Sequence, residues 1–364
     1  MEMNNLEEYL SDGIKTLVLD ALKQAAKNPK ETAFLLQYAA SSKKAEKLRH
    51  KAEKKGKHIP SFLIASITNR CNLNCSGCYH HARGDSKASS HAVSGMSRNE
   101  WGKIFKEAAE IGVSAILLSG GEPLMRIDVL EEAALHQSIL FPVFTNGTML
   151  DTAFLKLFEE HRNLVPIISI EGDEALTDTR RGQGTYKDAM QAMEKLKEQD
   201  LLFGTSITVT NKNLRYVTGE ETISRLENSG GKVAIFVEYV PFADQDLVLD
   251  DKDRLFLEER VTELKKKEKM IVISFPGDEK VSGGCLAAGR GFFHINANGG
   301  AEPCPFSPYS DSNVKTTSLE KALESPLFTR LRNDNTLLAD HKGGCVLFDM
   351  VDHVKSIVGT DSNT

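Results

Sequence analysis

The 364-residue chain lacks any hydrophobic run long enough to cross a membrane, and it has only six cysteines. No stretch approaches about 18 consecutive apolar residues, and residues 1–11 are acidic and polar, without the basic and apolar regions of a secretory signal. We therefore expect a cytoplasmic protein. Because the cytosol is reducing, disulfides are disfavoured, and metal ligation or catalysis is the better explanation for the cysteines.

The chain also lacks a surplus of basic residues, since its net charge is −6, and this gives no reason to expect nucleic acid as a partner. Residues 43–58 depart from the balance, with eight bases against two acids. Two interpretations stay open. Either this segment is the solvated face of helices packed on the main domain, or residues 1–58 make a peripheral contact with the inner membrane surface, which would point to a lipid or membrane-delivered substrate.

Hydrophobic periodicity divides the chain at Pro60. Residues 1–59 read as helices only, on both sides of Asn28-Pro29. The strands expected after Pro60 cover residues 62–67, 113–118, 142–145, 165–170, 203–208 and 232–238, and the expected helices cover residues 97–111, 127–138, 152–160, 186–199 and 218–228. This alternation predicts an α/β fold, a partial (β/α)6 TIM-like barrel over residues 60–243 with an all-helical N-terminal extension.

The pattern changes after residue 243. Residues 244–280 read as a linker, with a charged helix near 251–269 and a strand at 270–274. Residues 281–364 read as a small α+β domain. In it, Asn298-Gly299 between short alternating runs predicts a hairpin, because both turn residues need a positive φ, and one helix is expected at 318–332.

Three cysteines, Cys71, Cys75 and Cys78, form a C-x3-C-x2-C group in the loop after the first expected strand. Thiolates so close in sequence can ligate three irons of one cluster, whereas a complete cluster site usually takes four cysteines, so one iron is left open. The alternatives are a structural zinc completed by His80 or His81, and three loop cysteines without a metal role. Zinc sites favour paired C-x2-4-C knuckles with a second pair downstream, which disfavours zinc here.

This triplet resembles that of the radical S-adenosylmethionine (SAM) superfamily, in which it follows the first strand of a partial (β/α)6 barrel. Further similar motifs lie at the carboxyl ends of the expected strands, where such barrels build their sites. The resemblance implies these cofactor-binding residues: Gly120, Gly121, Glu122 and Pro123 in a GGEP motif that holds the amino group of SAM, Asn146 after the third strand, Ser169 and Glu171 near the SAM ribose, and Arg181 near the SAM carboxylate.

Two positions depart from the family pattern. Gly77 stands before the third cysteine, where the family usually has an aromatic residue, and Tyr79 follows that cysteine instead. We therefore expect the aromatic shielding of the adenine to be displaced to Tyr79 or weakened. Glu171 replaces the usual aspartate. Neither departure touches a cluster ligand.

The resemblance implies radical chemistry. SAM would chelate the open iron of a [4Fe-4S] cluster, and one electron from a donor such as ferredoxin or flavodoxin would cleave it to methionine and a 5′-deoxyadenosyl radical, which abstracts hydrogen from an organic substrate. Such an enzyme is oxygen-sensitive and works anaerobically. A non-catalytic iron–sulfur electron carrier is the least favoured alternative, because it needs neither a barrel nor a SAM-like site.

The remaining cysteines are Cys285, Cys304 and Cys345. The spacing Cys285-x13-Gly299-x4-Cys304 resembles the opening of SPASM and twitch extensions, in which a hairpin after the barrel binds an auxiliary cluster. Three cysteines match a shorter, twitch-like version with one cluster, which gives two [4Fe-4S] clusters in total. Either one of Asp340, His341, Asp349 and His353 completes the auxiliary site, or an iron stays open to bind substrate. The plain alternative is three buried cysteines without a metal.

Two substrate classes stay open. SPASM and twitch relatives frequently modify ribosomal peptides, and many of them use an N-terminal winged-helix domain whose strands are not expected in residues 1–59. This favours a small-molecule, cofactor or lipid precursor over a peptide. Thr208, Thr210, Glu238 and Tyr239 are expected to line the barrel cavity, and the sequence assigns no catalytic residue.

Overall fold

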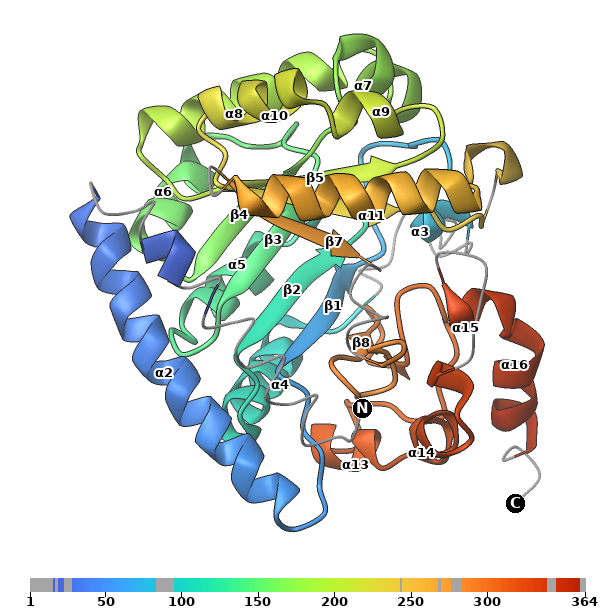
Figure 1. Ribbon diagram of the computed structural model, residues 1–364. Helices are drawn as coiled ribbons and strands as arrows, with labels where there is room; N and C mark the ends of the chain where they lie inside the picture. The colour runs from blue at the N-terminus through green and yellow to red at the C-terminus, as the bar shows by residue number, and fades with distance from the viewer. Residues whose placement is uncertain are drawn as a thin grey trace.

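The computed structural model describes residues 16, 19–22, 28–82, 95–242, 244–267, 270–275, 283–338 and 345–360 (Figure 1). Its centre is a nine-stranded sheet with the strand order β7-β6-β5-β4-β3-β2-β1-β8-β9. Neighbouring strands are parallel, except in the antiparallel hairpin of β8 and β9. Consecutive parallel strands linked by helices confirm the expected α/β fold with a partial-barrel wall.

The strands begin and end within two residues of the expected positions from β1 to β7. Their bounds are β1 (Phe62–Thr68), β2 (Ala115–Gly120), β3 (Phe141–Thr145), β4 (Leu164–Ser169), β5 (Gly204–Val209), β6 (Val233–Glu238), β7 (Ile271–Phe275), β8 (His294–Ile295) and β9 (Ala301–Glu302). Most residues of β1, β4 and β5 are buried, as is typical of parallel strands covered by other elements.

The connecting helices carry clear end signals. The main ones are α4 (Arg98–Ile111), α5 (Ile127–Ala134), α6 (Thr152–Glu160), α8 (Thr185–Glu198) and α10 (Glu220–Asn228). For example, α4 begins with a capping box of Ser97 and Glu100 and ends at Gly112, whose φ is 101°.

Two expected helices were wrong in extent. The helix expected at 127–138 ends at Ala134. The helix expected at 318–332 is two helices, α13 (Leu319–Leu323) and α14 (Pro326–Asn333). Proline has no backbone N–H and fits only the first turn of a helix, so Pro326 starts a new one, which the Ser325 side chain caps.

The sheet extends past both edges of the expected barrel. The segment expected as a linker contributes α11 (Asp251–Lys266) and β7, and β7 pairs in parallel with β6. At the other edge, β8 pairs in parallel with β1 and brings the C-terminal hairpin into the same sheet, across the boundary expected at residue 281. A pairing partner there removes the open edge that β1 would otherwise present.

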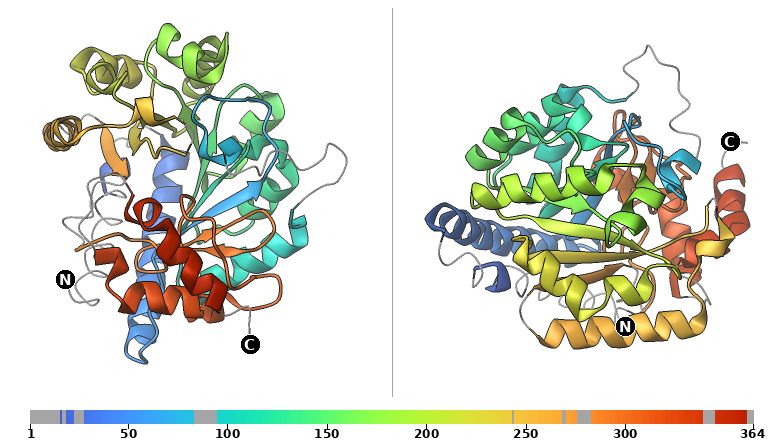
Figure 2. Two further views of the ribbon diagram at one scale, coloured as in Figure 1. Left: turned by 90° about the vertical axis from the view of Figure 1, so that its right-hand side faces the viewer. Right: turned by 90° about the horizontal axis from the view of Figure 1, so that it is seen from above.

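The N-terminal helix α2 (Pro29–Glu53) and the C-terminal helices α15 (Val346–Asp349) and α16 (Val351–Thr360) lie on opposite sides of the molecule (Figures 1 and 2). Along α2, the Tyr38 hydroxyl donates to the Ser114 carbonyl at 3.1 Å, and Arg49 Nη1 donates to the Gly112 carbonyl at 2.7 Å. Both side chains are almost fully buried. This packing supports the first interpretation of the basic segment, a helix on the barrel with a solvated charged face.

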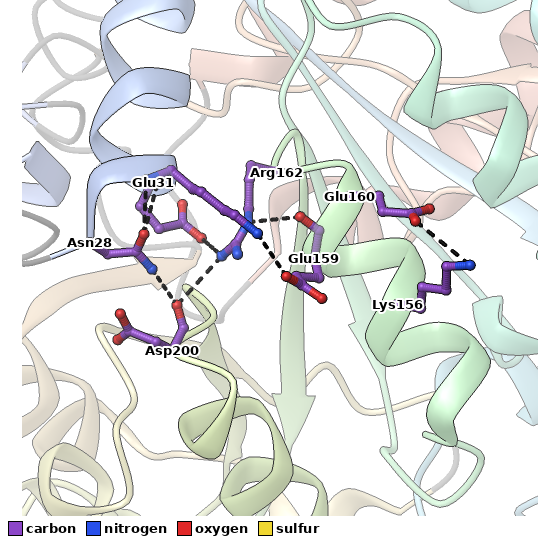
Figure 3. A network of polar contacts seen from close by, with 8 residues as sticks. Asn28, Glu31, Lys156, Glu159, Glu160, Arg162 and Asp200 are labelled. Atoms are coloured by element: carbon purple, nitrogen blue, oxygen red, sulfur yellow. Dashed lines mark hydrogen bonds and ion pairs between the residues drawn. The ribbon is translucent and has the colours of Figure 1, made fainter.

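A polar network fixes the start of α2 (Figure 3). Glu31 accepts from Arg162 Nη1 at 2.5 Å, and Asn28, the N-cap of α2, donates to the Asp200 carbonyl at 2.6 Å. Arg162 and Asp200 lie in the connections that lead into β4 and β5, so α2 is attached at the amino ends of the strands.

Among the described helices, none is both long and apolar enough to span a bilayer.

Candidate functional site

The first three cysteines lie in the loop between β1 and α3 (Tyr79–Ala82), at the carboxyl ends of the strands. Cys71, Cys75 and Cys78 are partly exposed. Backbone hydrogen bonds extend the pairing of β1 and β2 into this loop: Gly121 N–H donates to the Thr68 carbonyl and Glu122 N–H to the Arg70 carbonyl, both at 2.8 Å. The residues just before Cys71 are therefore held like the end of a strand.

The paired glycines of the GGEP motif are required by this close approach. A β-carbon on Gly120 would collide with the Thr68 carbonyl oxygen, and one on Gly121 with the Arg70 carbonyl oxygen. Gly120 also has a φ of 124°, which side-chain-bearing residues rarely adopt. Both glycines thus position the cysteine loop through the backbone.

Two further connections hold the same loop. Asn72 lies between Cys71 and Cys75, and its side chain accepts from Asn146 Nδ2 at 2.9 Å and donates to Thr148 Oγ1 at 2.7 Å. Later in the loop, Ser76 N–H donates to the Arg180 carbonyl at 2.7 Å. The loop is therefore attached to the residues that follow β2, β3 and β4.

Glu122 is the hub between β2 and β3. Its carboxylate accepts from Thr145 Oγ1 at 2.6 Å, from Asn146 N–H at 2.8 Å and from Leu124 N–H at 3.0 Å. The residue is 1% exposed, and this burial raises the pKa of its carboxyl group despite the three donors. Glu122 thus orders Asn146, which in turn holds the cysteine loop.

Glu171 gathers two arginines beside the loop. Its Oε1 accepts from Arg180 Nη1 at 2.6 Å and from Arg181 Nε at 2.8 Å, and its Oε2 accepts from Thr208 N–H at 3.0 Å. All three side chains of this ion-pair group are largely buried. Burial opposes the charge of Arg181, but the Glu171 carboxylate and the Cys75 thiolate keep the pKa of Arg181 above its usual value.

The thiols and the arginines form one electrostatic unit. Burial, with smaller contributions from Glu122, Cys75 and Cys78, raises the pKa of Cys71 to about 11. Burial also raises the pKa of Cys75, while Arg181 and Arg180 lower it. Iron coordination would deprotonate these thiols. Three reachable thiols on one loop with two cations behind them suit an anionic iron–sulfur cluster, so the residues present fit the group that the sequence implied.

Each histidine of the zinc alternative has one ring nitrogen bonded to the backbone. His80 Nε2 is hydrogen bonded to the Asn69 carbonyl and His81 Nε2 to the Leu73 carbonyl, each at 2.9 Å. In each ring this leaves Nδ1 as the nitrogen that could ligate a metal. Within the described ranges, no three Cys, His, Asp or Glu side chains form a site for a single metal ion.

The aromatic ring nearest to Gly77 comes from β6. Gly77 has a φ of 66°, and a β-carbon on it would lie 2.8 Å from Cε2 of Tyr239. Tyr239 follows β6 directly and is 3% exposed. The sequence placed Tyr239 in the cavity without a role, and its position beside Gly77 could not be found from spacing. Tyr79, the aromatic residue expected at the adenine, lies edge-to-face with Phe306, with ring centroids 5.4 Å apart.

Tyr79 and Phe306 belong to a group of five neighbouring aromatic residues, each only partly buried. The group consists of Tyr79, Phe242, Phe275, Phe306 and Phe348. Tyr79 follows Cys78, Phe306 lies two residues after Cys304, and Phe348 lies three residues after Cys345. This aromatic group therefore links the two cysteine groups in space.

The second three cysteines lie in the C-terminal part, and all are buried: Cys285, Cys304 and Cys345 are 7%, 3% and 8% exposed. Cys285 N–H donates to the Leu337 carbonyl at 2.7 Å, Cys304 lies in a tight turn after β9, and Cys345 is the N-cap of α15. Of the candidate fourth ligands, Asp340 and His341 lie outside the described residues. His353 Nε2 is hydrogen bonded to Asp334 Oδ2 at 2.8 Å.

The other expected site residues are at the carboxyl end of the barrel. Pro123 is buried at the start of a short 3-10 helix, and Ser169 ends β4 opposite Ser206 of β5. Thr210 is buried against Asn213, and Glu238 accepts from Arg254 Nε at 2.7 Å. Sequence reasoning missed Asn72 and Arg180, although their places between two cysteines and beside Arg181 were visible signals.

A partial parallel barrel with a three-cysteine loop at its mouth defines the class of protein. Residues 65–230 match the model of the Radical SAM superfamily. This part of the chain is similar to radical SAM domains, a domain type that uses a [4Fe-4S] cluster and SAM, and the chain is a radical-based enzyme.

Relatives at 27–28% identity include two synthases and one maturation protein. The chain is 27% identical over 320 residues to an AdoMet-dependent heme synthase of Methanosarcina barkeri, covering 79% of this chain and 88% of that protein. It is 28% identical over 207 residues to the Fe-coproporphyrin III synthase of the same organism, covering 54% and 49%. It is 28% identical over 177 residues to the sporulation killing factor maturation protein SkfB of Bacillus subtilis, covering 48% and 41%. The chain thus spans less than half of the latter two proteins.

Solved structures share the fold. Streptococcus suis SuiB, bound to its precursor peptide SuiA, superposes with a TM-score of 0.67 at 16% identity and covers 89% of this chain and 78% of that one. The protein anSMEcpe with bound AdoMet gives a TM-score of 0.59 at 16% identity, covering 84% and 100%. At such low identity the likeness concerns the fold alone.

Proposed function

We propose that this radical SAM enzyme acts on a small-molecule, cofactor or lipid precursor, and that within this range its substrate is a tetrapyrrole cofactor precursor. The observation that carries the proposal is the aromatic group that links the two cysteine groups. Large planar ring systems stack on aromatic side chains, and partly exposed rings from separate elements provide such a surface.

The proposed cluster ligands are Cys71, Cys75 and Cys78 for the SAM cluster and Cys285, Cys304 and Cys345 for one auxiliary [4Fe-4S] cluster. When bound, the first cluster and SAM supply a carbon-centred radical that abstracts hydrogen from the substrate. The chain's own residues hold this site in place. Gly120 and Gly121 fix the loop, and the pair of arginines on Glu171 balances the negative charge of the thiolates.

The relatives support this substrate class. The heme synthase matches over most of both chains, whereas SkfB matches over less than half of each. The hydrogen bond between His353 Nε2 and Asp334 leaves Nδ1 as the His353 nitrogen that could ligate the auxiliary cluster. Asp340, His341, Asp349 and His353 stay the proposed candidates for that ligand, as does an open iron that binds substrate.

Peptide modification is the second candidate. The fold likeness to SuiB with its precursor peptide and the match to SkfB favour it. Against it, the described part of residues 1–59 is helical, without the strands of a winged-helix domain.

The external electron donor is proposed to be a ferredoxin or flavodoxin.

Release of 5′-deoxyadenosine tests the proposal. Anaerobically reconstituted enzyme with SAM and dithionite is incubated alone, with iron coproporphyrin III, or with small peptides encoded beside its gene. We expect iron coproporphyrin III to increase 5′-deoxyadenosine release and to be consumed, because bound substrate commits the radical to productive turnover. Stimulation by the peptide alone would replace the tetrapyrrole proposal with peptide maturation.

A further inference from the structure

A hydrogen-bonded chain of three buried side chains joins the barrel to the C-terminal hairpin. Ser66 Oγ lies 2.7 Å from His294 Nε2, and His294 Nδ1 lies 2.8 Å from Glu302 Oε2. Asn296 Nδ2 donates to the other carboxylate oxygen, Glu302 Oε1, at 2.7 Å. Ser66, His294 and Glu302 are 4%, 0% and 2% exposed.

Strand register puts these side chains on one face of the sheet. His294 is paired with Ile64 of β1 and with Glu302 of β9, and Ser66 is two residues beyond Ile64. Since side chains alternate along a strand, Ser66 projects away from Ala65 and Ile67 on either side of it. Ser66 also lies on the strand that leads into the cysteine loop, five residues before Cys71.

The next strand presents a second hydroxyl on the same face. Ser119 of β2 is the register partner of Ser66 and directly precedes Gly120. Its Oγ is buried and has no hydrogen-bond partner among the described residues. Buried hydroxyls are nearly always hydrogen bonded, so this atom can take a partner that the described residues do not supply.

The order hydroxyl, imidazole, carboxylate is that of proton-transfer triads. An ionised Glu302 only accepts, so His294 Nδ1 carries the proton of that hydrogen bond and a neutral ring leaves Nε2 to accept from Ser66. The Ser66 lone pairs then remain available to a substrate proton, while Glu302 and Asn296 fix the ring orientation.

We propose that Ser66, His294 and Glu302 form the proton-accepting site of the substrate oxidation, with Ser119 bound to the same substrate group. This rests on the proposed function. Hydrogen abstraction would leave one unpaired electron on the substrate carbon, and the auxiliary cluster proposed for Cys285, Cys304 and Cys345, if bound, would accept that electron. An adjacent O–H, N–H or C–H bond breaks, and its electron pair forms the new π bond. Its proton goes to Ser66 Oγ as the Ser66 proton moves to His294 Nε2.

Ser66 is the catalytic residue in this scheme, because it touches the substrate, and His294 and Glu302 are positioning and proton-holding residues. The scheme predicts that loss of the site separates SAM cleavage from substrate oxidation. The first radical step needs no base, so 5′-deoxyadenosine still forms, but the substrate radical is no longer deprotonated.

The experiment compares holoenzyme variants with SAM, dithionite and iron coproporphyrin III as the probe. In His294→Gln and Ser66→Ala, the amount of probe consumed per 5′-deoxyadenosine released is expected to fall at least tenfold. Ser66→Thr keeps the hydroxyl and is expected to retain coupling. His58→Gln is the matched control, because His58 makes a similar pair of hydrogen bonds. Its Nδ1 lies 3.0 Å from Glu53 Oε2, and its Nε2 lies 2.7 Å from the Arg290 carbonyl oxygen in the C-terminal part.

Each outcome decides. A tenfold loss of coupling in His294→Gln, with iron content unchanged and with His58→Gln coupled as in wild type, supports the site. The proposal is overturned if His294→Gln consumes as much probe per 5′-deoxyadenosine as wild type, or if His294→Gln and His58→Gln lose this ratio equally. His294 then only connects the barrel to the C-terminal hairpin. If wild type itself neither consumes the probe nor is stimulated by it, the proposed tetrapyrrole substrate is overturned, and this inference with it.

Discussion

Tyr239 lies against the α-carbon of Gly77, so that a β-carbon at Gly77 would stand 2.8 Å from Cε2 and 2.9 Å from the hydroxyl oxygen of the tyrosine ring. The Tyr239 hydroxyl accepts from Asp244 N–H at 3.1 Å, which fixes the ring. A residue at the end of β6 thus supplies an aromatic surface at the loop position where the family usually carries one. Gly77 and Tyr239 are thus linked: the glycine makes room for a ring that directly follows β6.

Gly77→Ala is therefore expected to disturb the cysteine loop. The left-handed φ of 66° alone costs an alanine roughly 1–2 kcal/mol, and contact with Tyr239 adds to this. We expect lower iron retention after reconstitution and a weaker spectroscopic response of the cluster to SAM, measured by electron paramagnetic resonance.

Gly184→Ala is the matched control for this substitution. Gly184 has a φ of 85°, and a β-carbon added there would have nothing within 4 Å of it, so this variant tests the backbone cost alone. A Tyr239→Leu variant should soften the effect of Gly77→Ala, because neighbouring sites are not additive. Equal effects of Gly77→Ala and Gly184→Ala on SAM response would contradict the role given to Tyr239.

Glu171→Gln is expected to destabilise the protein strongly. The substitution leaves Arg180 and Arg181 largely buried without their shared carboxylate, and breaking a buried ion pair in this way typically costs about 3–5 kcal/mol. Denaturant unfolding should show this loss. Glu220→Gln is the control: Glu220 is exposed and pairs with Arg260 and Lys267, and surface pairs contribute about 0–1 kcal/mol. Similar losses in both variants would contradict the buried hub.

Much of the barrel could be predicted from the sequence because each strand from β1 to β6 is an apolar run followed by an amphipathic helix, and both patterns are local. The pairing of β8 with β1 was not predictable, since two-residue strands such as His294–Ile295 carry no periodicity. The cysteine loop was likewise recognisable from its own spacing. The contacts that hold it, such as Tyr239 on Gly77, depend on tertiary packing between segments far apart in the chain.

The roles of the motif carboxylates were also hidden. The sequence indicated Glu122 and Glu171 as SAM contacts, and the structure places both carboxylates among internal donors at 1% exposure. Their contact with SAM stays a prediction, whereas the three hydrogen bonds that each accepts from the chain show that it orders other residues. No one-dimensional pattern shows which residues of its own fold a carboxylate holds.

The packing of α2 predicts that the basic segment does not bind membranes. Leu35 and Tyr38, on the helix that would have to enter the lipid, are 3% and 1% exposed because they are buried on the barrel. In a flotation experiment with anionic liposomes, we expect the protein to stay in the aqueous fraction. Flotation that is lost when Lys43, Lys47 and Lys51 are replaced by glutamine would contradict this and restore the membrane interpretation.

Arg49→Ala tests the same packing from the side of stability. Arg49 is 2% exposed and donates to the Gly112 carbonyl at 2.7 Å and to Ser114 Oγ at 3.0 Å. Since hydrogen bonds to charged groups contribute about 1.5–3 kcal/mol, thermal unfolding should occur at a clearly lower temperature. Lys47→Ala, at an exposed position of α2, should leave it nearly unchanged. A barrel equally stable in both variants would mean that α2 is not part of its packing.

Iron content distinguishes one cluster from two. Each set of three cysteines is proposed to hold one [4Fe-4S] cluster, so anaerobically reconstituted wild type should bind about eight irons, and Cys75→Ala and Cys304→Ala about four each. The two variants should differ in activity. Cys75→Ala removes a ligand of the SAM cluster and should abolish 5′-deoxyadenosine release, whereas Cys304→Ala leaves that cluster in place and should still cleave SAM under dithionite. The opposite result would be about four irons in wild type and the same number in Cys304→Ala. It would show that Cys285, Cys304 and Cys345 are buried cysteines without a metal, because replacing a true cluster ligand lowers the iron content.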